Sequence, residues 1–330
     1  MSRIAVAGAG TWGIALARML LLSGHEVSVW SALPEEIDEL SENRTHKNLP
    51  GMVIPDEMVF SKDLGSVCSG AEVIVMAVPS VFVRSTAKTL APLVSGDQII
   101  VDVAKGIEPE SMLTMSEVIS SEIPDVPVVA LSGPTHAEEV ARDLPTTIVS
   151  ACKDLSVAEK VQEIFSNKVM RVYTNTDIKG VELCGALKNI IALACGCLTG
   201  LGYGDNIKAA AITRGLSEIR RLGLAMGCLP ETFSGLAGMG DLIVTATSVH
   251  SRNNRCGRLI GEGLSVKEAV SRVGMVVEGI SAIPAAVELA DKYGIDIPII
   301  RAVESVVNGG QDPRAVVDHL MSLKGIPEFN

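Results

Sequence analysis

The chain has few aromatic side chains and no paired cysteine motif. Aromatic residues make up 3% of the 330 residues, so small aliphatic side chains and 31 glycines must fill the interior, which suits the close helix–sheet contacts of an α/β protein. Seven cysteines are scattered without a CxxC spacing, which indicates reduced thiols of a cytosolic protein. Cys195 and Cys197 would point to different faces of a helix, so we predict core residues there and no metal site.

The sequence also lacks a long apolar run and a surplus of basic residues. It has no stretch of roughly 18 uninterrupted apolar residues and no secretory leader, so neither a membrane span nor a signal peptide is predicted. The formal net charge of −11 argues against a general nucleic-acid or anionic-membrane surface. We therefore expect a cytoplasmic protein without a nucleic-acid partner or membrane insertion, in which an anionic substrate needs a local basic pocket.

The amino-terminal segment has the pattern strand, glycine loop, helix. An apolar run at 3–7 leads into the motif GAGTWG and then into a helix-like segment. Gly8 permits the tight turn, Gly10 allows a pyrophosphate to approach the backbone, and Gly13 allows the helix to pack on the strand. Because a second strand follows at 26–30, this pattern predicts a dinucleotide site rather than an ordinary glycine-rich turn.

The end of this second strand does not show which cofactor is used. An acidic residue there would hold a ribose hydroxyl, and an arginine would accept the additional phosphate of NADP. The sequence at 31–33 is Ser-Ala-Leu, so the choice between NAD and NADP stays open. Glu35 and Glu36 are interpreted as a helix start, and the polar segment 43–55 as a loop.

Three further strands are predicted at 72–77, 98–103 and 127–131, each ending in a loop. Ligands of open α/β sheets collect beyond the carboxyl ends of the strands, so these loops should line the same crevice as the glycine loop. Lys105 is the charged group among them, and its alternative interpretation is a solvated loop lysine. His136 is interpreted as a helix-start residue rather than a catalyst.

The strand pattern stops in the middle of the chain. Strands are predicted at 146–150 and 169–174, and the sequence after about 178 is helical. We expect an α/β Rossmann-like N-terminal domain at 1–176, which binds the dinucleotide. An all-α C-terminal domain at 177–330 then carries the substrate site, with the joint near the start of its first helix.

One lysine interrupts the helix-like run 181–195. At helical spacing Lys188 shares its face with residues that carry no charge: Val181, Cys184, Gly185, Ile191, Ala192 and Cys195. An ammonium group in such surroundings loses hydration, which lowers its pKa and makes it a candidate proton donor and acceptor near neutral pH. The alternative is a lysine that faces solvent at the edge of a buried helix.

The second half of the chain offers one acid and one candidate phosphate site. A glycine-rich segment at 235–240, predicted as a flexible loop, delivers Asp241, and Thr245 follows one helical turn later. Ser251 and Arg252 begin a further helix-like segment with Asn253. A serine cap, free backbone N–H groups and a guanidinium at a helix start can bind a phosphate. The alternative is plain helix capping with a solvated arginine.

Taken together, these segments resemble the bacterial NAD(P)-dependent glycerol-3-phosphate dehydrogenase family. The resemblance covers nearly the whole chain, through the ordered segments GAGTWG, NLPGMVIP, VDVAKGIEP, LSGPTHAEEVA, GVELCGALKNIIALACG, TRGLSEIRRLG, GLAGMGDLIVTATSVHSRNNRCG and VVEGISA. It implies a Rossmann-like domain joined to an all-helical domain like that of 6-phosphogluconate dehydrogenase. It also implies reduction of dihydroxyacetone phosphate to sn-glycerol 3-phosphate with NAD(P), which supplies glycerophospholipid synthesis.

The resemblance also implies roles for individual residues. Lys188 would be the proton acceptor in the oxidation direction. The substrate would contact Lys105, Gly133, Thr135, Lys188, Asp241, Ser251, Arg252 and Asn253. The cofactor would contact Thr11, Trp12, Lys105, Ala137, Arg252, Val276 and Glu278, beside the glycines Gly8, Gly10 and Gly13. A homodimer is expected, although the sequence itself does not determine the oligomeric state.

One position departs from the family, and two rival functions remain open. The family often has a basic residue shortly after the second strand, where this chain has Ala32, which puts a strong preference for NADP in doubt.

The first rival is a related two-domain reductase that acts on an unphosphorylated hydroxy or keto acid. The second is a dinucleotide sensor without turnover, which has no need for a lysine on an uncharged helix face.

Overall fold

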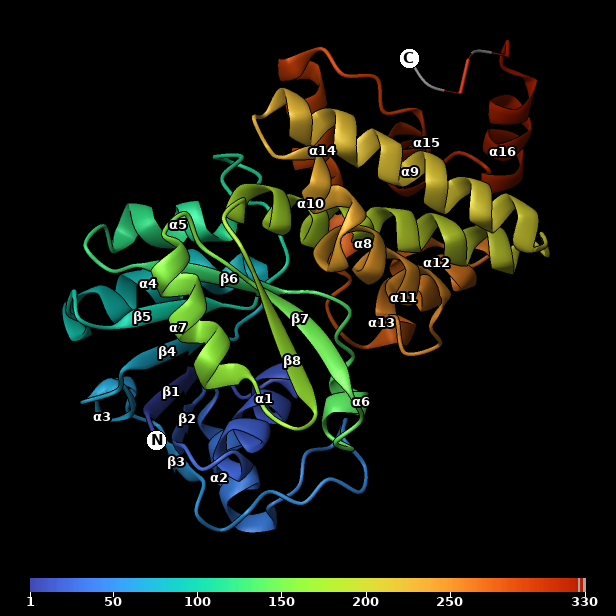
Figure 1. Cartoon of the computed structure of the whole chain (residues 1–330). Helices are drawn as coiled ribbons and strands as arrows, with labels where there is room; N and C mark the ends of the chain where they lie inside the picture. Colours follow the sequence, from blue (N-terminus) through green and yellow to red (C-terminus); the bar gives the residue numbers. More distant parts are fainter. Residues whose placement is uncertain (326, 329–330) are drawn as a thin grey trace.

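The computed structural model describes residues 1–325 and 327–328, which form a sheet lobe followed by a helical lobe (Figure 1). Eight strands build the sheet lobe: β1 (Arg3–Ala7), β2 (Glu26–Trp30), β3 (Val59–Ser61), β4 (Val73–Met76), β5 (Ile99–Asp102), β6 (Val128–Ser132), β7 (Thr146–Ala151) and β8 (Met170–Asn175). Every residue of β4, β5 and β6 is buried, as expected for strands covered on both faces. Their nearly continuous apolar sequences are therefore the local reason for a central sheet.

The strands form one sheet in the order β3-β2-β1-β4-β5-β6-β7-β8. All neighbouring strands are parallel except β6 and β7. The chain moves from β1 outward to β2 and β3 and then returns to pair β4 with the other side of β1. Ligands of such sheets bind at this reversal, outside the carboxyl ends of the strands. The topology therefore predicts the binding crevice beside the loop that follows β1.

Helices cover both faces of the sheet. The elements of this lobe are α1 (Thr11–Leu22), α2 (Pro34–Asn43), α3 (Leu64–Cys68), α4 (Val83–Leu90), α5 (Met115–Glu122), α6 (Ala137–Val140) and α7 (Leu155–Phe165), with 3-10 turns η1 (Ser80–Phe82) and η2 (Ala91–Leu93). One apolar cluster joins α1, α2, α6 and α7 to the sheet, and another joins α3, α4 and α5 to it. These two clusters fix the carboxyl edge of the sheet, where the candidate site lies.

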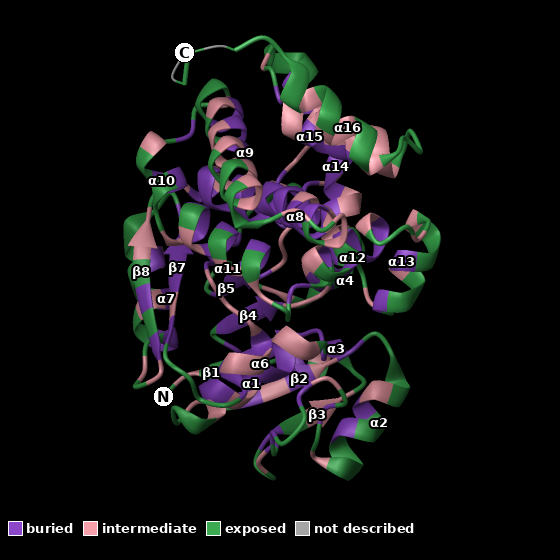
Figure 2. Ribbon diagram, turned by 90° about the vertical axis from the view of Figure 1, so that its right-hand side faces the viewer, coloured by how far each residue is buried: buried purple, intermediate pink, exposed green. Residues whose placement is uncertain are grey.

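The helical lobe is built around α8 (Ile178–Gly200), which Figure 2 shows almost entirely buried at its centre. The surrounding elements are α9 (Asp205–Ala225), α10 (Pro230–Ser234), η3 (Leu236–Gly240), α11 (Asp241–Thr247), α12 (Arg252–Gly261), α13 (Val266–Val273), α14 (Glu278–Tyr293), α15 (Pro298–Val307) and α16 (Pro313–Ser322). By length and a mean hydropathy of 1.6, α8 is apolar enough to cross a membrane, but 89% of that stretch is buried within the protein. It is the core helix of this lobe.

Four glycines allow α8 and α12 to cross in close contact: Gly196, Gly200, Gly257 and Gly261. A Cβ atom on Gly196 would lie 2.0 Å from the carbonyl oxygen of Asn254, and a Cβ atom on Gly257 would lie 2.0 Å from that of Leu193. Because these neighbours are backbone atoms, they cannot move aside as a flexible side chain would. The glycines therefore fix the start of α12 at a set position along α8.

The predicted fold class is confirmed, but one local prediction is wrong and one strand was missed. The segment Leu236–Gly240 is a π-helical turn that runs into α11, in which the N–H of Gly240 donates to the carbonyl of Gly235 at 3.1 Å. A Cβ atom on Gly238 would lie 2.2 Å from the carbonyl oxygen of Phe233, so this glycine serves close packing rather than flexibility. Strand β3 was not predicted, since three half-exposed residues carry no clear periodicity.

The chain passes from the last strand to the first core helix within two residues. Strand β8 ends at Asn175 and α8 begins at Ile178. Asp177 caps α8 by accepting from the N–H of Gly180 at 3.0 Å, and its other oxygen accepts from the hydroxyl of Thr232 at 2.7 Å. The joint is therefore tied into the helical lobe. The division into residues 1–176 and 177–330 remains a prediction.

Candidate active site

The turn between β1 and α1 has the geometry of a dinucleotide phosphate cradle. Gly8 has a φ angle of +128° and approaches Ala77 so closely that a Cβ atom would lie 2.5 Å from its carbonyl oxygen. A Cβ atom on Gly13 would meet the carbonyl of Gly8, whereas the space beside Gly10 is open. The N-cap residue of α1 is Gly10, which has no side chain to cap the helix, so the first N–H groups of α1 can bind an anion. The residues present therefore fit a pyrophosphate.

The segment after α2 packs against this turn. The side-chain amide of Asn48 donates to the hydroxyl of Thr11 at 3.1 Å, and the half-buried Trp12 packs against the apolar cluster of the sheet lobe. The polar segment predicted as a loop is thus part of the wall around the glycine turn. Direct contacts of Thr11 and Trp12 with a cofactor remain a prediction.

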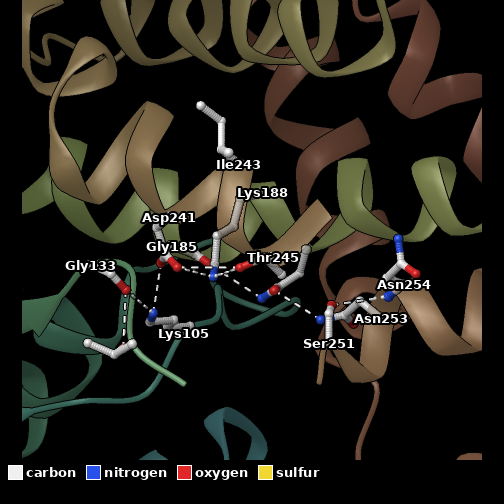
Figure 3. A network of polar contacts seen from close by, with 12 residues as sticks. Lys105, Gly133, Gly185, Lys188, Asp241, Ile243, Thr245, Ser251, Asn253 and Asn254 are labelled. Atoms are coloured by element: carbon white, nitrogen blue, oxygen red, sulfur yellow. Dashed lines mark hydrogen bonds and ion pairs between the residues drawn. The ribbon is translucent and has the colours of Figure 1, made fainter. Parts of the chain in front are cut away.

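Lys188 lies in the middle of α8 and is bound to an acid from another helix (Figure 3). Its Nζ atom donates to Oδ1 of Asp241 at 2.5 Å and to the hydroxyl of Thr245 at 2.6 Å. Oδ2 of Asp241 accepts from Nζ of Lys105 at 2.7 Å. Lys105 follows β5, so a single carboxylate joins two amines that come from different lobes.

Burial and neighbouring charges together decide the protonation of Lys188 and Asp241. Lys188 is 5% exposed and Asp241 is 1% exposed. Burial lowers the pKa of Lys188 from 10.5 to about 7, with the attraction of Asp241 acting against this shift and the charge of Lys105 adding to it. Burial alone would raise the pKa of Asp241, but the two ammonium groups outweigh it and the pKa lies below its usual value. At neutral pH the acid is thus ionised, and Lys188 can hold or release a proton.

The loop after β6 contributes a carbonyl oxygen to the same cluster. Nζ of Lys105 donates to the carbonyl of Gly133 at 3.0 Å, and the hydroxyl of Thr135 donates to the same oxygen at 3.1 Å. Gly133 has a φ angle of +156°, and a Cβ atom there would lie 3.1 Å from Cα of Ile148. The glycine is therefore needed where the loop passes β7. Ala137 lies just beyond, as the first residue of α6.

His136 occupies the N-cap position of α6, as the interpretation of a helix start requires. Its Nε2 atom is buried without a hydrogen-bond partner among residues 1–325 and 327–328. Burial lowers the pKa of His136, and the charge of Lys188 contributes in the same direction. The ring centre lies 5.8 Å from that of His250, close to the start of α12. His136 is thus a neutral ring at the border of the lysine cluster.

The start of α12 presents both a cap and a free cation. The hydroxyl of Ser251 accepts from the N–H of Asn254 at 3.2 Å, so Ser251 is the N-cap. The side chain of Arg252 is exposed and forms no ion pair within the described part of the chain. The side chain of Asn253 is buried. Its Nδ2 atom donates to Oδ1 of Asn189 at 2.9 Å, and its Oδ1 atom accepts from the N–H of Gly279 at 2.8 Å. Asn253 therefore joins α12 to both α8 and α14.

The start of α14 bridges the two lobes. Oε2 of Glu278 accepts from the hydroxyl of Ser80 at 2.7 Å, and Ser80 begins the 3-10 turn η1, which follows β4. A Cβ atom on Gly106 would lie 2.4 Å from Cβ of Ser80, so the loops after β4 and β5 are in contact. Val276 is 38% exposed just before the helix. Glu278 and Asp241 are thus two separate links between the helical lobe and the carboxyl edge of the sheet.

The predicted residues fall into linked groups. One chain of hydrogen bonds runs from Lys188 through Asp241 and Lys105 to the carbonyl of Gly133, which also accepts from Thr135. A second set of bonds joins Asn253 to α8 and α14. The predictions missed the contacts of Thr245, Asn189 and Ser80. A signal existed for Asn189, because a polar amide next to Lys188 on an otherwise apolar helix needs a buried partner. No comparable signal existed for Ser80, which is an ordinary turn residue by sequence.

The fold and the site define the class of protein. A glycine turn at the switch point of a mainly parallel sheet, together with a buried lysine of a helical lobe that is linked through Asp241 to the loop after β5, is the arrangement of a two-domain dinucleotide-dependent oxidoreductase. Residues 3–158 match the family model of the NAD-dependent glycerol-3-phosphate dehydrogenase N-terminus, and residues 177–318 match that of the C-terminus. The chain belongs to the NAD-dependent glycerol-3-phosphate dehydrogenase family.

Individual relatives support the same membership. The glycerol-3-phosphate dehydrogenase (NAD(P)+) 2 of Lactobacillus delbrueckii subsp. bulgaricus is 65% identical over 327 residues, which cover 97% of each chain. The glycerol-3-phosphate dehydrogenase (NAD(P)+) of Agathobacter rectalis is 50% identical over 322 residues, covering 97% of this chain and 96% of the relative. The crystal structure of glycerol-3-phosphate dehydrogenase from Coxiella burnetii superposes with a TM-score of 0.94 at 36% identity and covers 98% of this chain and 99% of that one.

Proposed function

We propose that this chain reversibly reduces dihydroxyacetone phosphate to sn-glycerol 3-phosphate with NAD(P)H. The observation that carries the proposal is the buried contact of Lys188 with Asp241, beside the loops that follow β5 and β6. An amine with a pKa of about 7 is suited to exchange a proton with a substrate oxygen at neutral pH. Membership of the family supports the same reaction.

The cofactor would lie along the glycine turn and extend toward the helical lobe. Gly8, Gly10 and Gly13 would hold its phosphates, and the remaining contacts would come from Thr11, Trp12, Lys105, Ala137, Arg252, Val276 and Glu278. When bound, the reduced nicotinamide supplies the hydride that is transferred to the ketone carbon. Lys105 contributes positive charge at the carboxyl edge of the sheet, where the two lobes meet.

Lys188 would provide the proton. As negative charge grows on the ketone oxygen, a protonated Nζ atom stabilises this charge and then donates its proton. In the oxidation direction the neutral amine accepts the proton of the substrate hydroxyl. Asp241 and Thr245 each bind Nζ, which fixes the direction of the amine before the substrate arrives. Both are therefore positioning residues in this mechanism.

The substrate phosphate would bind at the start of α12. Arg252 is exposed there, and the first N–H groups of a helix favour an anion. A local cation is needed because the chain as a whole carries a net charge of −11. Ser251 fixes the helix start, and Asn253 fixes α12 against α8, so the phosphate contact positions the ketone relative to Lys188.

Replacement of Lys188 by methionine tests the proposal. We expect kcat for dihydroxyacetone phosphate to fall by about 10²- to 10⁴-fold, because the proton donor is lost, while the Kd for NADH stays unchanged. Lys179→Met is the matched control, since Lys179 lies on the same helix and pairs with Glu117 away from the cluster. Equal turnover of the Lys188→Met variant and the wild type would remove Lys188 from the mechanism. Equally fast reduction of unphosphorylated dihydroxyacetone would favour the rival reductase.

We further propose a cytoplasmic homodimer that supplies glycerophospholipid synthesis. The dimer is supported by the apolar side of the C-terminal helices, where a cavity of about 750 Å³ lies among α8, α9, α15 and α16. Met321 and Leu323 are exposed on the same part of the chain. Light scattering of the purified protein should give a particle mass of twice the chain mass of 34.6 kDa. The Met321→Asp variant should give a lower particle mass. A wild-type mass of one chain contradicts the dimer.

A further inference from the structure

The carboxylate of Glu36 is fixed at the end of β2. Its Oε2 atom accepts a hydrogen bond from the hydroxyl of Ser31 at 2.7 Å, and this hydroxyl accepts from the N–H of Leu33 at 3.1 Å. Ser31 is 6% exposed and follows directly after the last residue of β2. The sequence has no acid at this strand end, but the first turn of α2 folds back and brings one there.

Glu36 faces the glycine turn across a small hollow. The hollow is lined by Ala9 of that turn, by α2 and by the segment that follows α2: Ala9, Glu36, Glu39, Leu40, Thr45, His46 and Lys47. The same segment is tied to the start of α1 by the bond from Asn48 to Thr11. The carboxylate therefore lies on the side of the phosphate cradle where the chain of β2 ends. In a Rossmann fold this is the side on which the adenosine ribose of a dinucleotide is bound.

The charges around this hollow disfavour an additional anion. Glu36 and Glu39 contribute two negative charges, and Lys47 contributes one positive charge. Burial lowers the pKa of His46, so its ring is neutral at pH 7. The guanidinium of Arg44 donates to the carbonyl of Met58 at 2.9 Å, and Arg44 is not among the residues that line the hollow. The local balance of formal charge is therefore negative.

We propose, on the basis of the proposed function, that Glu36 determines the cofactor as NAD(H). Its carboxylate accepts a hydrogen bond from the 2′-hydroxyl of the adenosine ribose, with Ser31 holding the carboxylate in place. The 2′-phosphate of NADP(H) would lie against the same carboxylate and against Glu39, with Lys47 as the opposing cation. The ribose-binding acid thus comes from the first turn of α2 rather than from the end of the strand.

Binding measurements without turnover test this assignment. Calorimetric Kd values are measured for NADH and NADPH, and for 5′-AMP and adenosine 2′,5′-bisphosphate, at one ionic strength. We expect the wild type to bind NADH at least about tenfold more tightly than NADPH. In Glu36→Gln the ratio of the Kd for NADPH to the Kd for NADH should shrink by about tenfold, because the amide lacks the charge that repels the phosphate. The adenosine nucleotides should show the same change.

A matched variant separates this effect from a general change of charge. Glu35→Gln removes the same charge from the same helical turn but does not line the hollow, and it should preserve the wild-type ratio. Ser31→Ala leaves the charge of Glu36 and removes its anchor, so it should weaken NADH binding more than NADPH binding. If Glu36→Gln does not fold, as judged by circular dichroism, Ser31→Ala decides the assignment.

The outcomes distinguish this assignment from the proposed reaction. A ratio that is the same in the wild type, Glu36→Gln and Ser31→Ala overturns the role of Glu36, even if dihydroxyacetone phosphate is reduced. A ratio that shrinks only in Glu36→Gln and Ser31→Ala supports the role of Glu36, even if no turnover of dihydroxyacetone phosphate is found. A wild type that binds NADPH more tightly than NADH also overturns the assignment.

Discussion

Nζ of Lys188 lies 2.5 Å from Oδ1 of Asp241, and both groups are buried. The other oxygen of the same carboxylate binds Lys105, so one negative charge faces two amines. Removal of such charges from water is costly, and a buried ion pair is poor evidence for a gain in stability. The cluster is better explained by chemistry, since the two amines compete for one acid and burial lowers the pKa of Lys188.

Asp241→Asn should impair both catalysis and folding. The variant leaves two amines facing a neutral amide, so the pKa of Lys188 should fall further and the amine should lose its direction. We expect the free energy of unfolding at pH 6 to fall by about 3–5 kcal/mol, as when one partner of a buried pair is removed. The loss should be smaller at pH 9, where Lys188 is neutral. Urea unfolding at both pH values measures this difference.

The control for this variant is Asp205→Asn, which breaks the exposed pair with Lys208 at the start of α9. It should change neither the urea midpoint nor kcat, because exposed pairs contribute little. An equal loss of stability at pH 6 and pH 9 in Asp241→Asn would contradict the role of the Lys188 charge.

The rates of the two reaction directions should depend on pH in opposite senses. With a pKa of about 7, Lys188 is mainly protonated below pH 7 and mainly neutral above it. Reduction needs the proton on Nζ, so its kcat should fall as pH rises through about 7, while kcat for oxidation should rise over the same range. Initial rates between about pH 5.5 and 9 measure how kcat for reduction and kcat for oxidation depend on pH. Parallel profiles in the two directions would contradict a proton held by Lys188.

The sequence predicted those features that depend on local chemistry. The strands, the glycine turn and the cap at Ser251 follow from periodicity, from the conformational range of glycine and from a serine hydroxyl near its own helix start. The apolar surroundings of Lys188 on its helix also indicated a buried amine. Each of these signals lies within a few residues of the feature that it predicts.

Contacts between distant segments left no comparable signal. Asp241 is 53 residues away from Lys188, and the packing of α11 on α8 within the helical lobe decides the distance between them. Lys105 is 136 residues away from Asp241, and the packing of the two lobes decides that distance. The carboxylate of Glu36 was missed for a different reason. The spacing rule seeks an acid on the strand itself, whereas here a helical residue is brought back to Ser31.

Gly257→Ala should destabilise the helical lobe strongly. The new Cβ atom would lie 2.0 Å from the carbonyl oxygen of Leu193 and 2.9 Å from the backbone nitrogen of Cys197, so the helices must move apart. We expect a loss of about 3 kcal/mol, the upper part of the usual range for overpacking. Gly325→Ala is the control, because Gly325 is exposed outside the helices and its Cβ atom meets no neighbour within 4 Å, and it should stay within about 0.5 kcal/mol. Thermal unfolding compares the two variants, and equal midpoints would contradict the close crossing of α8 and α12.

Arg252 and Asn253 are neighbours in sequence, but their replacement by alanine should have different effects. Arg252 is exposed, so Arg252→Ala should leave the free energy of unfolding within about 0.5 kcal/mol of the wild type. Its KM for dihydroxyacetone phosphate should rise by about 10- to 100-fold, because a charge-assisted contact to the phosphate is lost. Steady-state kinetics and urea unfolding of the same preparations measure both effects. An unchanged KM would contradict a phosphate site at α12.

Asn253→Ala should act through the structure. It removes the partners of the Gly279 N–H and of Oδ1 of Asn189, which lie on α14 and α8. A buried polar group without a partner costs about 1–3 kcal/mol, so the free energy of unfolding should fall by at least that amount. The start of α12 then loses its fixed position relative to Lys188, and kcat should fall together with a rise in KM. If Asn253→Ala instead raised KM alone at full stability, Asn253 would act by contact with the substrate rather than by holding the three helices together.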